Sequence, residues 1–269
     1  MCALNEVKGM WVTMNEENLI NYYNKFYEEK RLKTRHGQVE FITTIKYIEK
    51  YLKPDSKILD IGAGSGTYSK YFQDKGYSVT AIELVKHNCR MIEEKGIKVY
   101  QGNATNIPFI ENNSYDIVLL FGPMYHLISN EEKIKALKEA KRVVKDDGLI
   151  FISYIMNDYA IIAHGFMEKA IIKSKNKKQI NEQFKVTPAP TDLYSYVSID
   201  DINNLNEIVG LNRIEIIAQD GAANYIRYYL NQLNEEEFNE FIKYHLLNCE
   251  RFDLLGSSAH LLDILKKDN

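Results

Sequence analysis

The chain has 269 residues, of which 45% are hydrophobic and 26% are charged, and its formal net charge is -3. The near balance of 34 basic and 37 acidic residues argues against a nucleic-acid-binding protein, and the apolar content excludes a disordered one. No run of about 18 apolar residues predicts a membrane span. The three cysteines, Cys2, Cys89 and Cys249, are too dispersed to predict a disulfide framework, so we expect a reduced, cytoplasmic protein.

The N-terminal part is expected to be helical. Residues 15–52 carry aromatic and aliphatic side chains at helical spacing, and Gly37 is expected to break the segment into two helices. Pro54 then ends it, because the residue before a proline avoids helical dihedral angles. Residues 1–13 lack regular patterning and are expected to be a loose extension.

From residue 57 onward, short apolar runs alternate with helical patterns. The strands are expected at 57–62, 77–83, 97–104, 115–122 and 148–155, and the helices at 65–76, 86–96 and 130–148. Ser129 and Glu132 have the spacing of a capping box, and Gly148 is expected to close the third helix. This alternation predicts a parallel sheet that is covered by helices on both faces.

The alternation lapses between residues 156 and 198, where we expect a helical insertion with a proline-containing loop. It resumes with elements expected at 199–210, 213–221, 235–252 and 258–267, which read as helix, strand, helix and strand. Without a long linker, 1–269 is expected to be one domain. Its parts are N-terminal helices 14–53, a core 54–155, the insertion 156–198 and a C-terminal part 199–269.

The insertion contains a lysine cluster that could bind phosphate or form a solvated helix face. We favour the solvated face, because the overall charge does not support polyanion binding. The cluster consists of Lys169, Lys173, Lys175, Lys177 and Lys178.

The strongest local signal is the glycine loop Gly62-Ala63-Gly64-Ser65-Gly66 directly after the first core strand. Such a loop lets a ligand approach the backbone closely, and the helix behind it favours an anionic group. A dinucleotide site would have a third glycine where Thr67 stands, and Asp60 would repel a pyrophosphate. Glu83 ends the second strand, where a carboxylate suits an unphosphorylated ribose. A plain strand-to-helix turn without a ligand is the alternative.

The motif Asp60-x-Gly62-x-Gly64-x-Gly66, followed by Glu83, resembles the cofactor motif of class I S-adenosylmethionine-dependent methyltransferases. Later segments also resemble those of this family, in the same order: Gly102-Asn103-Ala104, Ile107-Pro108-Phe109, Tyr115-Asp116-Ile117-Val118 and Glu139-Ala140-x-Arg142-Val143-Val144. The resemblance covers residues 57–155 and is strongest to the bacterial small-molecule branch near the ubiquinone and menaquinone methyltransferases.

The resemblance implies an α/β, Rossmann-like, doubly wound fold. Its mostly parallel seven-stranded sheet would have an antiparallel last strand. The N-terminal helices and the insertion after the fifth strand would form a lid that selects the acceptor.

The resemblance also implies S-adenosylmethionine as the cofactor and S-adenosylhomocysteine as the product. Asp60 would face the cofactor's ammonium group, and Glu83 would bind the ribose hydroxyls. Leu84 would lie beside the adenine, with Asn103 accepting a hydrogen bond from its amino group and the Ala104 amide at a ring nitrogen. Asn103 stands where the family usually has Asp, so weaker recognition is expected. The residues implied to contact the methionine part or the sulfonium are Gly62, Ala63, Gly64, Gly66, Thr67 and Phe121.

The stretch after the fourth strand offers candidates for the methyl-transfer step. His126 has a suitable reference pKa for a general base, and Tyr125 could orient an acceptor or contact the sulfonium. The alternatives are a histidine that supports the turn and a tyrosine that packs. Phe121-Gly122-Pro123-Met124 replaces the tetrad of nucleobase-methylating enzymes, which argues against nucleic-acid amines. No motif predicts a metal site.

Segments outside the core supply candidate lid residues. Arg31 or Arg35 could bind the carboxylate of the cofactor, and the aromatic side chains could hold an acceptor and exclude water. Ordinary packing is the alternative for each residue, and His260 is expected to be structural. The candidate acceptor-binding residues are Tyr23, Tyr27, Tyr159, His164 and Tyr194.

The leading hypothesis is therefore a methyltransferase that acts on an oxygen, nitrogen or sulfur atom of a small molecule. The alternatives are a nicotinamide-dependent reductase and a non-catalytic protein that binds S-adenosylmethionine. We expect no nucleic-acid or membrane partner and mildly favour a monomer.

Overall fold

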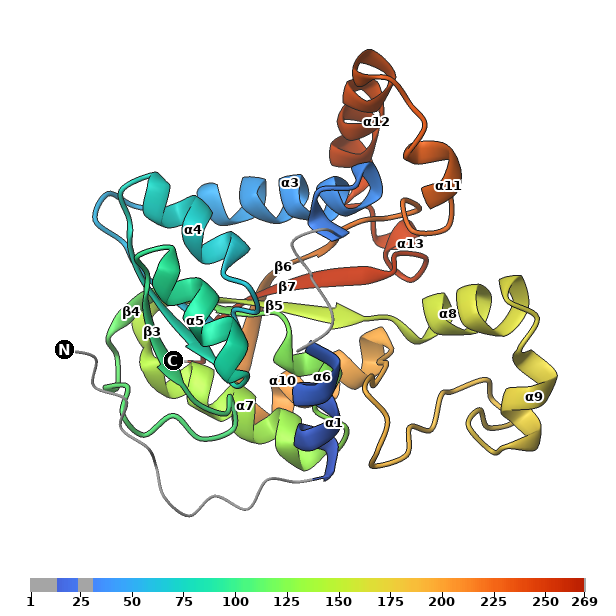
Figure 1. Cartoon of the computed structure of the whole chain (residues 1–269), viewed down its shortest axis with the longest axis horizontal. Coiled ribbons are helices and arrows are strands. Elements are labelled where there is room, and N and C mark those ends of the chain that lie inside the picture. Colours follow the sequence, from blue (N-terminus) through green and yellow to red (C-terminus); the bar gives the residue numbers. More distant parts are fainter. Residues whose placement is uncertain (1–13, 24–30, 269) are drawn as a thin grey trace.

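The computed structural model describes residues 14–23 and 31–268, and its centre is a seven-stranded sheet in the order β3-β2-β1-β4-β5-β7-β6 (Figure 1). The strands are β1 (Lys57–Ile61), β2 (Ser78–Glu83), β3 (Lys98–Gln101), β4 (Tyr115–Leu120), β5 (Val144–Ile155), β6 (Leu211–Ala218) and β7 (His260–Lys267). β1 to β5 pair in parallel, and β7 is antiparallel to both β5 and β6. The expected Rossmann-like sheet with an antiparallel last strand is confirmed.

Helices cover both faces of this sheet, as expected of a doubly wound fold. In Figure 1, α3 (Arg35–Glu49) and α4 (Thr67–Asp74) lie above the sheet, and α7 (Asn130–Val143) and α10 (Ile199–Val209) lie below it. α5 (Lys86–Glu94) packs against β2 and β3. The central strands are buried nearly throughout, so their apolar side chains face helices on both sides. Each fully buried Leu or Ile contributes about 1.5–3 kcal/mol to the stability of this core.

The end of α7 differs from the sequence-based expectation. The helix expected at 130–148 ends at Val143, because β5 begins at Val144 and includes Gly148. A Cβ on Gly148 would lie 2.8 Å from the Asp116 carbonyl oxygen, so this glycine permits strand pairing and does not end a helix. The capping box of Ser129 and Glu132 is present as expected.

Gly37 does not break a helix, which corrects the expectation for residues 15–52. α1 (Met14–Tyr23) is separate from α3, whose N-cap is Thr34. Gly37 lies in the first turn of α3, where a Cβ would come within 2.1 Å of the Arg31 carbonyl oxygen. The glycine is needed because the chain before α3 passes against the helix at this point.

The insertion and the last helices of the C-terminal part lie outside the sheet. The insertion contains α8 (Asn157–Ala160), the π-helix η1 (Ile161–Met167) and α9 (Ile171–Asn176), and it projects away from the sheet in Figure 1. The C-terminal part adds α11 (Arg227–Leu230), α12 (Glu235–Asn248) and α13 (Phe252–Leu255), and the short α6 (Pro123–His126) follows β4.

The lysine cluster lies on the insertion, and its members are exposed except for the half-buried Lys175, which pairs with Glu182 at 3.2 Å. This agrees with a solvated face. Among the helices of residues 14–23 and 31–268, none has the length and apolar character needed to cross a membrane.

Candidate active site

The glycine loop connects β1 to α4 with three glycines in left-handed conformations, which side chains adopt only with strain. Gly62 has a φ of 75°, and its amide donates a 2.8 Å hydrogen bond to the Ile82 carbonyl of the neighbouring strand. A Cβ on Gly62 would lie 2.4 Å from Cδ of Pro123, so the loop also depends on this glycine to pass the start of α6.

Glu83 ties the loop to the end of β2. Its buried carboxylate accepts 2.8 Å hydrogen bonds from the amides of Gly64 and Val85 and a 3.4 Å bond from Asn88 Nδ2. Because backbone amides hold both oxygens in place, the carboxylate has a fixed position at the carboxyl edge of the sheet. It lines a large pocket at this edge.

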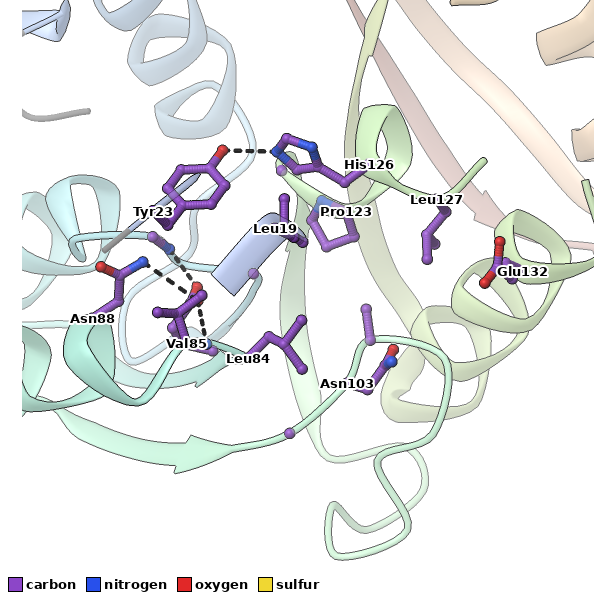
Figure 2. Close-up of a pocket in the computed structure, with 16 residues that line it drawn as sticks. Leu19, Tyr23, Leu84, Val85, Asn88, Asn103, Pro123, His126, Leu127 and Glu132 are labelled. Carbon is purple, nitrogen blue, oxygen red and sulfur yellow. Dashed lines mark hydrogen bonds between the residues drawn. The ribbon is translucent and has the colours of Figure 1, made fainter. Parts of the chain in front are cut away.

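That pocket has an empty volume of about 780 Å³, counting the part that is open to solvent. We call it the adenosine cavity, because the residues implied to hold the ribose and adenine line it. α1 contributes Leu19 and Tyr23 to its wall (Figure 2). The expected cofactor residues that line it are Gly62, Gly64, Glu83, Leu84, Asn103 and Ala104.

Asn103 has a different hydrogen-bonding role from the one expected. Its side-chain oxygen accepts 2.9 Å hydrogen bonds from both the amide and the hydroxyl of Thr105. An amide oxygen has two lone pairs, so this oxygen is already used within its own loop. The geometry therefore does not support this oxygen as the acceptor for the adenine amino group.

A second cavity, with an empty volume of about 450 Å³, begins at Gly62 and Gly122, which line both cavities. It contains the buried carboxylate of Asp60, which accepts a 2.6 Å hydrogen bond from Ser69 Oγ. We call it the transfer cavity, because it lies beyond the loop, on the side of the residues implied to hold the methionine part. Expected site residues that line it are Asp60, Gly62, Ala63, Thr67, Phe121 and Tyr125. It is also lined by Leu32, Glu40, Tyr68 and Ser153, which were not expected.

His126 is buried at the end of α6 and is hydrogen-bonded on both sides of its ring. Nδ1 donates to the Leu193 carbonyl at 2.7 Å, so Nε2 is the acceptor in the 2.7 Å hydrogen bond with the Tyr23 hydroxyl (Figure 2). Burial lowers the pKa of His126 to about 4. The imidazole is therefore neutral at pH 7, and its basic nitrogen is directed at α1.

Two expected acceptor-binding residues, Tyr23 and Tyr194, come together with Tyr125 around His126. The ring centroid of His126 lies 4.8 Å from that of Tyr125, 5.1 Å from that of Tyr194 and 5.4 Å from that of Tyr23. The Tyr194 hydroxyl also donates to the Tyr22 hydroxyl at 3.2 Å. This aromatic cluster fastens α1 and the insertion to α6. Tyr27 lies outside the described residues.

The remaining lid candidates lie elsewhere. Arg31 forms a two-pronged ion pair with Glu40, which lines the transfer cavity, and Arg35 lies over the Phe238 ring at 4.9 Å. Tyr159 packs against His164 in the insertion, with ring centroids 5.8 Å apart. None of these four candidates lines the adenosine or the transfer cavity.

Sequence reasoning missed several residues that line the adenosine cavity: Leu19, Val85, Asn88, Pro123, Leu127 and Glu132. Val85 and Asn88 follow Glu83 closely, so proximity to the motif could have indicated them. It also missed that Glu40, Asp220 and His260 come together, because these residues lie far apart in the chain and belong to no motif.

The strand order, the glycine loop and the carboxylate at the end of β2 define a Rossmann-like domain built to hold a nucleoside-type cofactor. The comparisons with known proteins agree. Residues 59–152 match the methyltransferase domain family. An uncharacterised methyltransferase of Staphylococcus carnosus is 28% identical over 160 residues, which are 59% of this chain and 71% of that protein.

A demethylmenaquinone methyltransferase of Paenarthrobacter aurescens is 33% identical over 104 residues, 38% of this chain and 40% of that protein. The match thus spans about two-fifths of that relative. A solved S-adenosylmethionine-dependent methyltransferase of Thermotoga maritima has the same fold, with a TM-score of 0.59 at 16% identity over 94% of this chain and 99% of that one. Residues 59–152 thus carry a methyltransferase domain, and the chain has the fold of the class I S-adenosylmethionine-dependent methyltransferases. This sets aside the reductase alternative.

Proposed function

We propose that the protein transfers a methyl group from S-adenosylmethionine to an oxygen, nitrogen or sulfur atom of a small-molecule acceptor. The observation that carries the proposal is the pair of cavities that meet at Gly62 and Gly122. One is lined by the fixed carboxylate of Glu83, which suits ribose hydroxyls. The other contains the buried carboxylate of Asp60, which suits an ammonium group.

In this arrangement the residues bind and align the two reactants. Glu83 would hold the ribose, and Leu84, Asn103 and Ala104 would surround the adenine. The sulfonium of S-adenosylmethionine supplies an activated methyl group, and alignment of the acceptor accounts for much of the rate acceleration in such a displacement. Phe121 and Tyr125 line the transfer cavity and would position the reacting groups and exclude water.

A small acceptor is favoured by the aromatic cluster, which fastens α1 and the insertion to α6 and so encloses the site. The balanced charge of the chain offers no support for a polyanionic acceptor. Other relatives of the chain include proteins named as an rRNA and an elongation-factor methyltransferase. We further propose a reducing, cytoplasmic setting, which the free and buried Cys89 and Cys249 support.

Calorimetric titration with S-adenosylmethionine, S-adenosylhomocysteine and NADH tests the cofactor, with Glu83→Ala as the key variant. We expect micromolar binding of both adenosyl compounds and none of NADH. A hydrogen bond to a charged group contributes about 1.5–3 kcal/mol, so Glu83→Ala should weaken binding roughly 10- to 100-fold. Glu94→Ala, an exposed carboxylate on the adjacent α5, is the matched control and should bind normally. Absence of adenosyl-compound binding in the wild type would contradict the proposal.

A transfer screen with methyl-labelled cofactor tests the acceptor class. The wild type is incubated separately with a metabolite extract, with total RNA and with a protein extract. We expect label in the small-molecule fraction. Label that enters only RNA or protein would overturn the small-molecule proposal and leave the cofactor assignment intact.

A further inference from the structure

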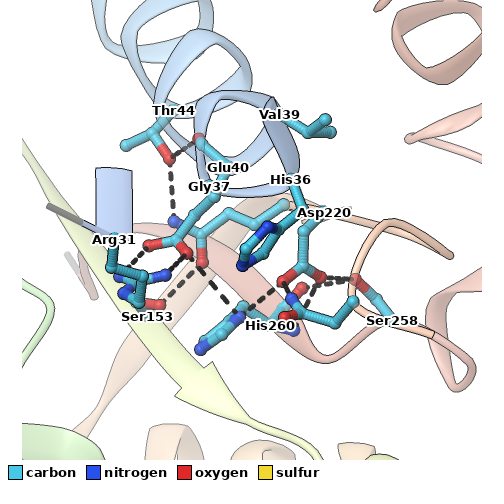
Figure 3. Close-up of polar contacts among 12 residues, drawn as sticks. Arg31, His36, Gly37, Val39, Glu40, Thr44, Ser153, Asp220, Ser258 and His260 are labelled. Atoms are coloured by element: carbon cyan, nitrogen blue, oxygen red, sulfur yellow. Dashed lines mark hydrogen bonds and ion pairs between the residues drawn. The ribbon is translucent and has the colours of Figure 1, made fainter. Parts of the chain in front are cut away.

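Two buried carboxylates and a partly buried histidine, from distant parts of the chain, meet beside the transfer cavity (Figure 3). Glu40 comes from α3, Asp220 follows β6 and His260 begins β7. Nδ1 of His260 lies 2.5 Å from Asp220 Oδ2 and 3.9 Å from Glu40 Oε2. Glu40 itself lines the transfer cavity, so the group reaches the wall of the proposed reaction chamber.

Asp220 is the fixed point of this group. Its fully buried carboxylate accepts hydrogen bonds from Ser258 Oγ at 2.7 Å, from the His260 amide at 2.9 Å and from Asn224 Nδ2 at 2.6 Å, in addition to the imidazole. With so many donors the carboxylate cannot turn. A carboxylate held in this way fixes the orientation of the histidine ring and keeps the proton on Nδ1.

The group is a hydrogen-bonded ion network and not a metal centre. Its ligand atoms lie within 4.8 Å of one another, which is close enough for a shared ion. However, Arg31 already occupies both oxygens of Glu40, and the Nδ1 proton occupies Asp220. A metal would have to displace both interactions, and the guanidinium would then repel it.

The groups of the network shift one another's pKa values in opposite directions. Burial raises the pKa of Glu40 and of Asp220, but neighbouring cations outweigh it and hold both below their usual values. Burial lowers the pKa of His260, and the carboxylates of Asp220 and Glu40 outweigh that effect and raise it above 6.5, against a smaller opposing effect of Arg31. Its imidazole is thus a stronger base than a free histidine.

The edge of the His260 ring that carries Nε2 lies opposite Nδ1 and points away from Asp220 (Figure 3). Three neighbours of the ring line the transfer cavity: Glu40, Ser153 and Tyr125, whose ring centroid is 6.4 Å from that of His260. His260 pairs with Ile155, and Leu262 pairs with Ser153, so His260 and Ser153 share one face of the sheet. The His260 ring therefore lies directly behind residues that line the chamber where an acceptor would lie.

We propose that His260, oriented by Asp220, is the general base that takes the proton from the acceptor. This deepens the proposed function and rests on it. As the acceptor atom forms its bond to the methyl carbon, the carbon–sulfur bond breaks and its electron pair remains on sulfur. The O–H, N–H or S–H proton passes to Nε2 of His260, and the imidazolium releases it to solvent after the product leaves. The acceptor class is thus a small molecule with a protic group.

His260 suits this role better than His126. The acceptor nitrogen of His126 is bonded to Tyr23, and burial lowers its pKa to about 4, so it is a weak base whose lone pair is engaged. His260 has the raised pKa and the Asp partner that general-base catalysis near neutral pH requires.

Chemical modification tests the accessibility and basicity of His260 without knowledge of the acceptor. The wild type is treated with diethyl pyrocarbonate between pH 5.5 and 8.5, and each histidine is followed by peptide mass spectrometry. We expect His260 to react with a pH midpoint above 6.5, and His126 to be protected. Asp220→Asn and Glu40→Gln each remove a carboxylate, so both should move the His260 midpoint to lower pH. An unreactive His260 at pH 8.5, or a midpoint unchanged in both variants, would overturn the proposal.

Turnover gives the second readout, with thiophenol, catechol and benzylamine as probes that carry S–H, O–H and N–H groups. His260→Gln should lower kcat for any probe turned over by about 100-fold or more, with the Kd for S-adenosylmethionine within twofold of wild type. Asp220→Asn should lower kcat less and shift the acidic limb of the pH profile to lower pH. Normal kcat in His260→Gln would overturn the base assignment. If no probe is methylated, the diethyl pyrocarbonate experiment alone decides whether the assignment of His260 stands.

Failure of this inference is distinguishable from failure of the proposed function. Loss of cofactor binding in the wild type would remove the proposed function, whatever the reactivity of His260. His87→Gln, which changes an exposed histidine on α5, is the control and should keep wild-type kcat.

Discussion

At the scale of single residues, the cofactor site depends on backbone positions that only glycine tolerates. Gly62 combines a φ of 75° with contact to Pro123, whereas Gly76 has a φ of 91° and no heavy atom within 4 Å of the place where a Cβ would lie. The two positions therefore separate backbone strain from steric overlap. Gly62 is also the residue at which the adenosine and transfer cavities meet.

Gly62→Ala is expected to destabilise the protein more than Gly76→Ala. Left-handed strain costs about 1–2 kcal/mol for either alanine, and at Gly62 the new methyl group must also displace the Pro123 ring. Urea denaturation measures the stability, and calorimetry measures the Kd for S-adenosylmethionine. Only Gly62→Ala should weaken cofactor binding, by at least tenfold. Equal stability losses with unchanged Kd values would contradict this account.

The positions of the motif residues were predictable from the sequence because their spacing reflects backbone geometry that must recur at such a loop. Asp60, Gly62, Gly64 and Glu83 line the two cavities at the carboxyl edge of the sheet. Asn103 also lines the adenosine cavity, but its hydrogen bonds to Thr105 depend on a local turn that the motif does not encode. The network of Asp220 and His260 was not predictable, because strand pairing alone brings these segments together.

At the scale of elements, the longer helices with a periodic apolar pattern were predicted, and the shortest ones were not. α7 and α10 begin at Ser129 and Ser198, each with a complete capping box. The end of α7 was misplaced because the residues after Val143 continue its charged pattern, and only pairing with β4 makes them a strand. Short helices such as α6 and α11 lack any periodic signal, so sequence patterns could not reveal them.

Ser129→Ala and Ser198→Ala form a matched pair at this scale. Each removes an N-cap, which costs about 1 kcal/mol, so both should lower the free energy of unfolding similarly. Glu132, the capping partner of Ser129, also lines the adenosine cavity, whereas the cap of α10 does not. Only Ser129→Ala should therefore raise the Kd for S-adenosylmethionine, by a few-fold in calorimetry. Identical Kd values in the two variants would show that the cap does not position the cavity wall.

At the scale of the whole molecule, His126 connects three segments that are far apart in the chain. It lies in α6, donates to the insertion at Leu193 and accepts from α1 at Tyr23. Sequence reasoning offered this histidine as a base or as a support for its turn, and our proposal assigns the role of base to His260. The geometry supports a structural role: the His126 ring holds α1 in place over the adenosine cavity, so protonation of the ring should release α1.

His126 should therefore make the protein sensitive to mild acid. Its pKa is about 4 in the folded state and about 6.5 when unfolded, so the unfolded chain binds the proton more tightly across that window. The contribution of the neutral His126 ring to the free energy of unfolding is fully present above pH 6.5 and is lost as the pH falls towards 4. The loss between pH 7 and 4.5 should be about 2 kcal/mol, measured by urea denaturation. This loss of stability should shrink in His126→Gln but not in His87→Gln, and parallel curves for all three proteins would refute the assignment.

The hydrogen bond between His126 and Tyr23 also predicts an effect on cofactor binding. His126→Gln should raise the Kd for S-adenosylmethionine several-fold at pH 7, measured by calorimetry, because Tyr23 then loses its partner over the adenosine cavity.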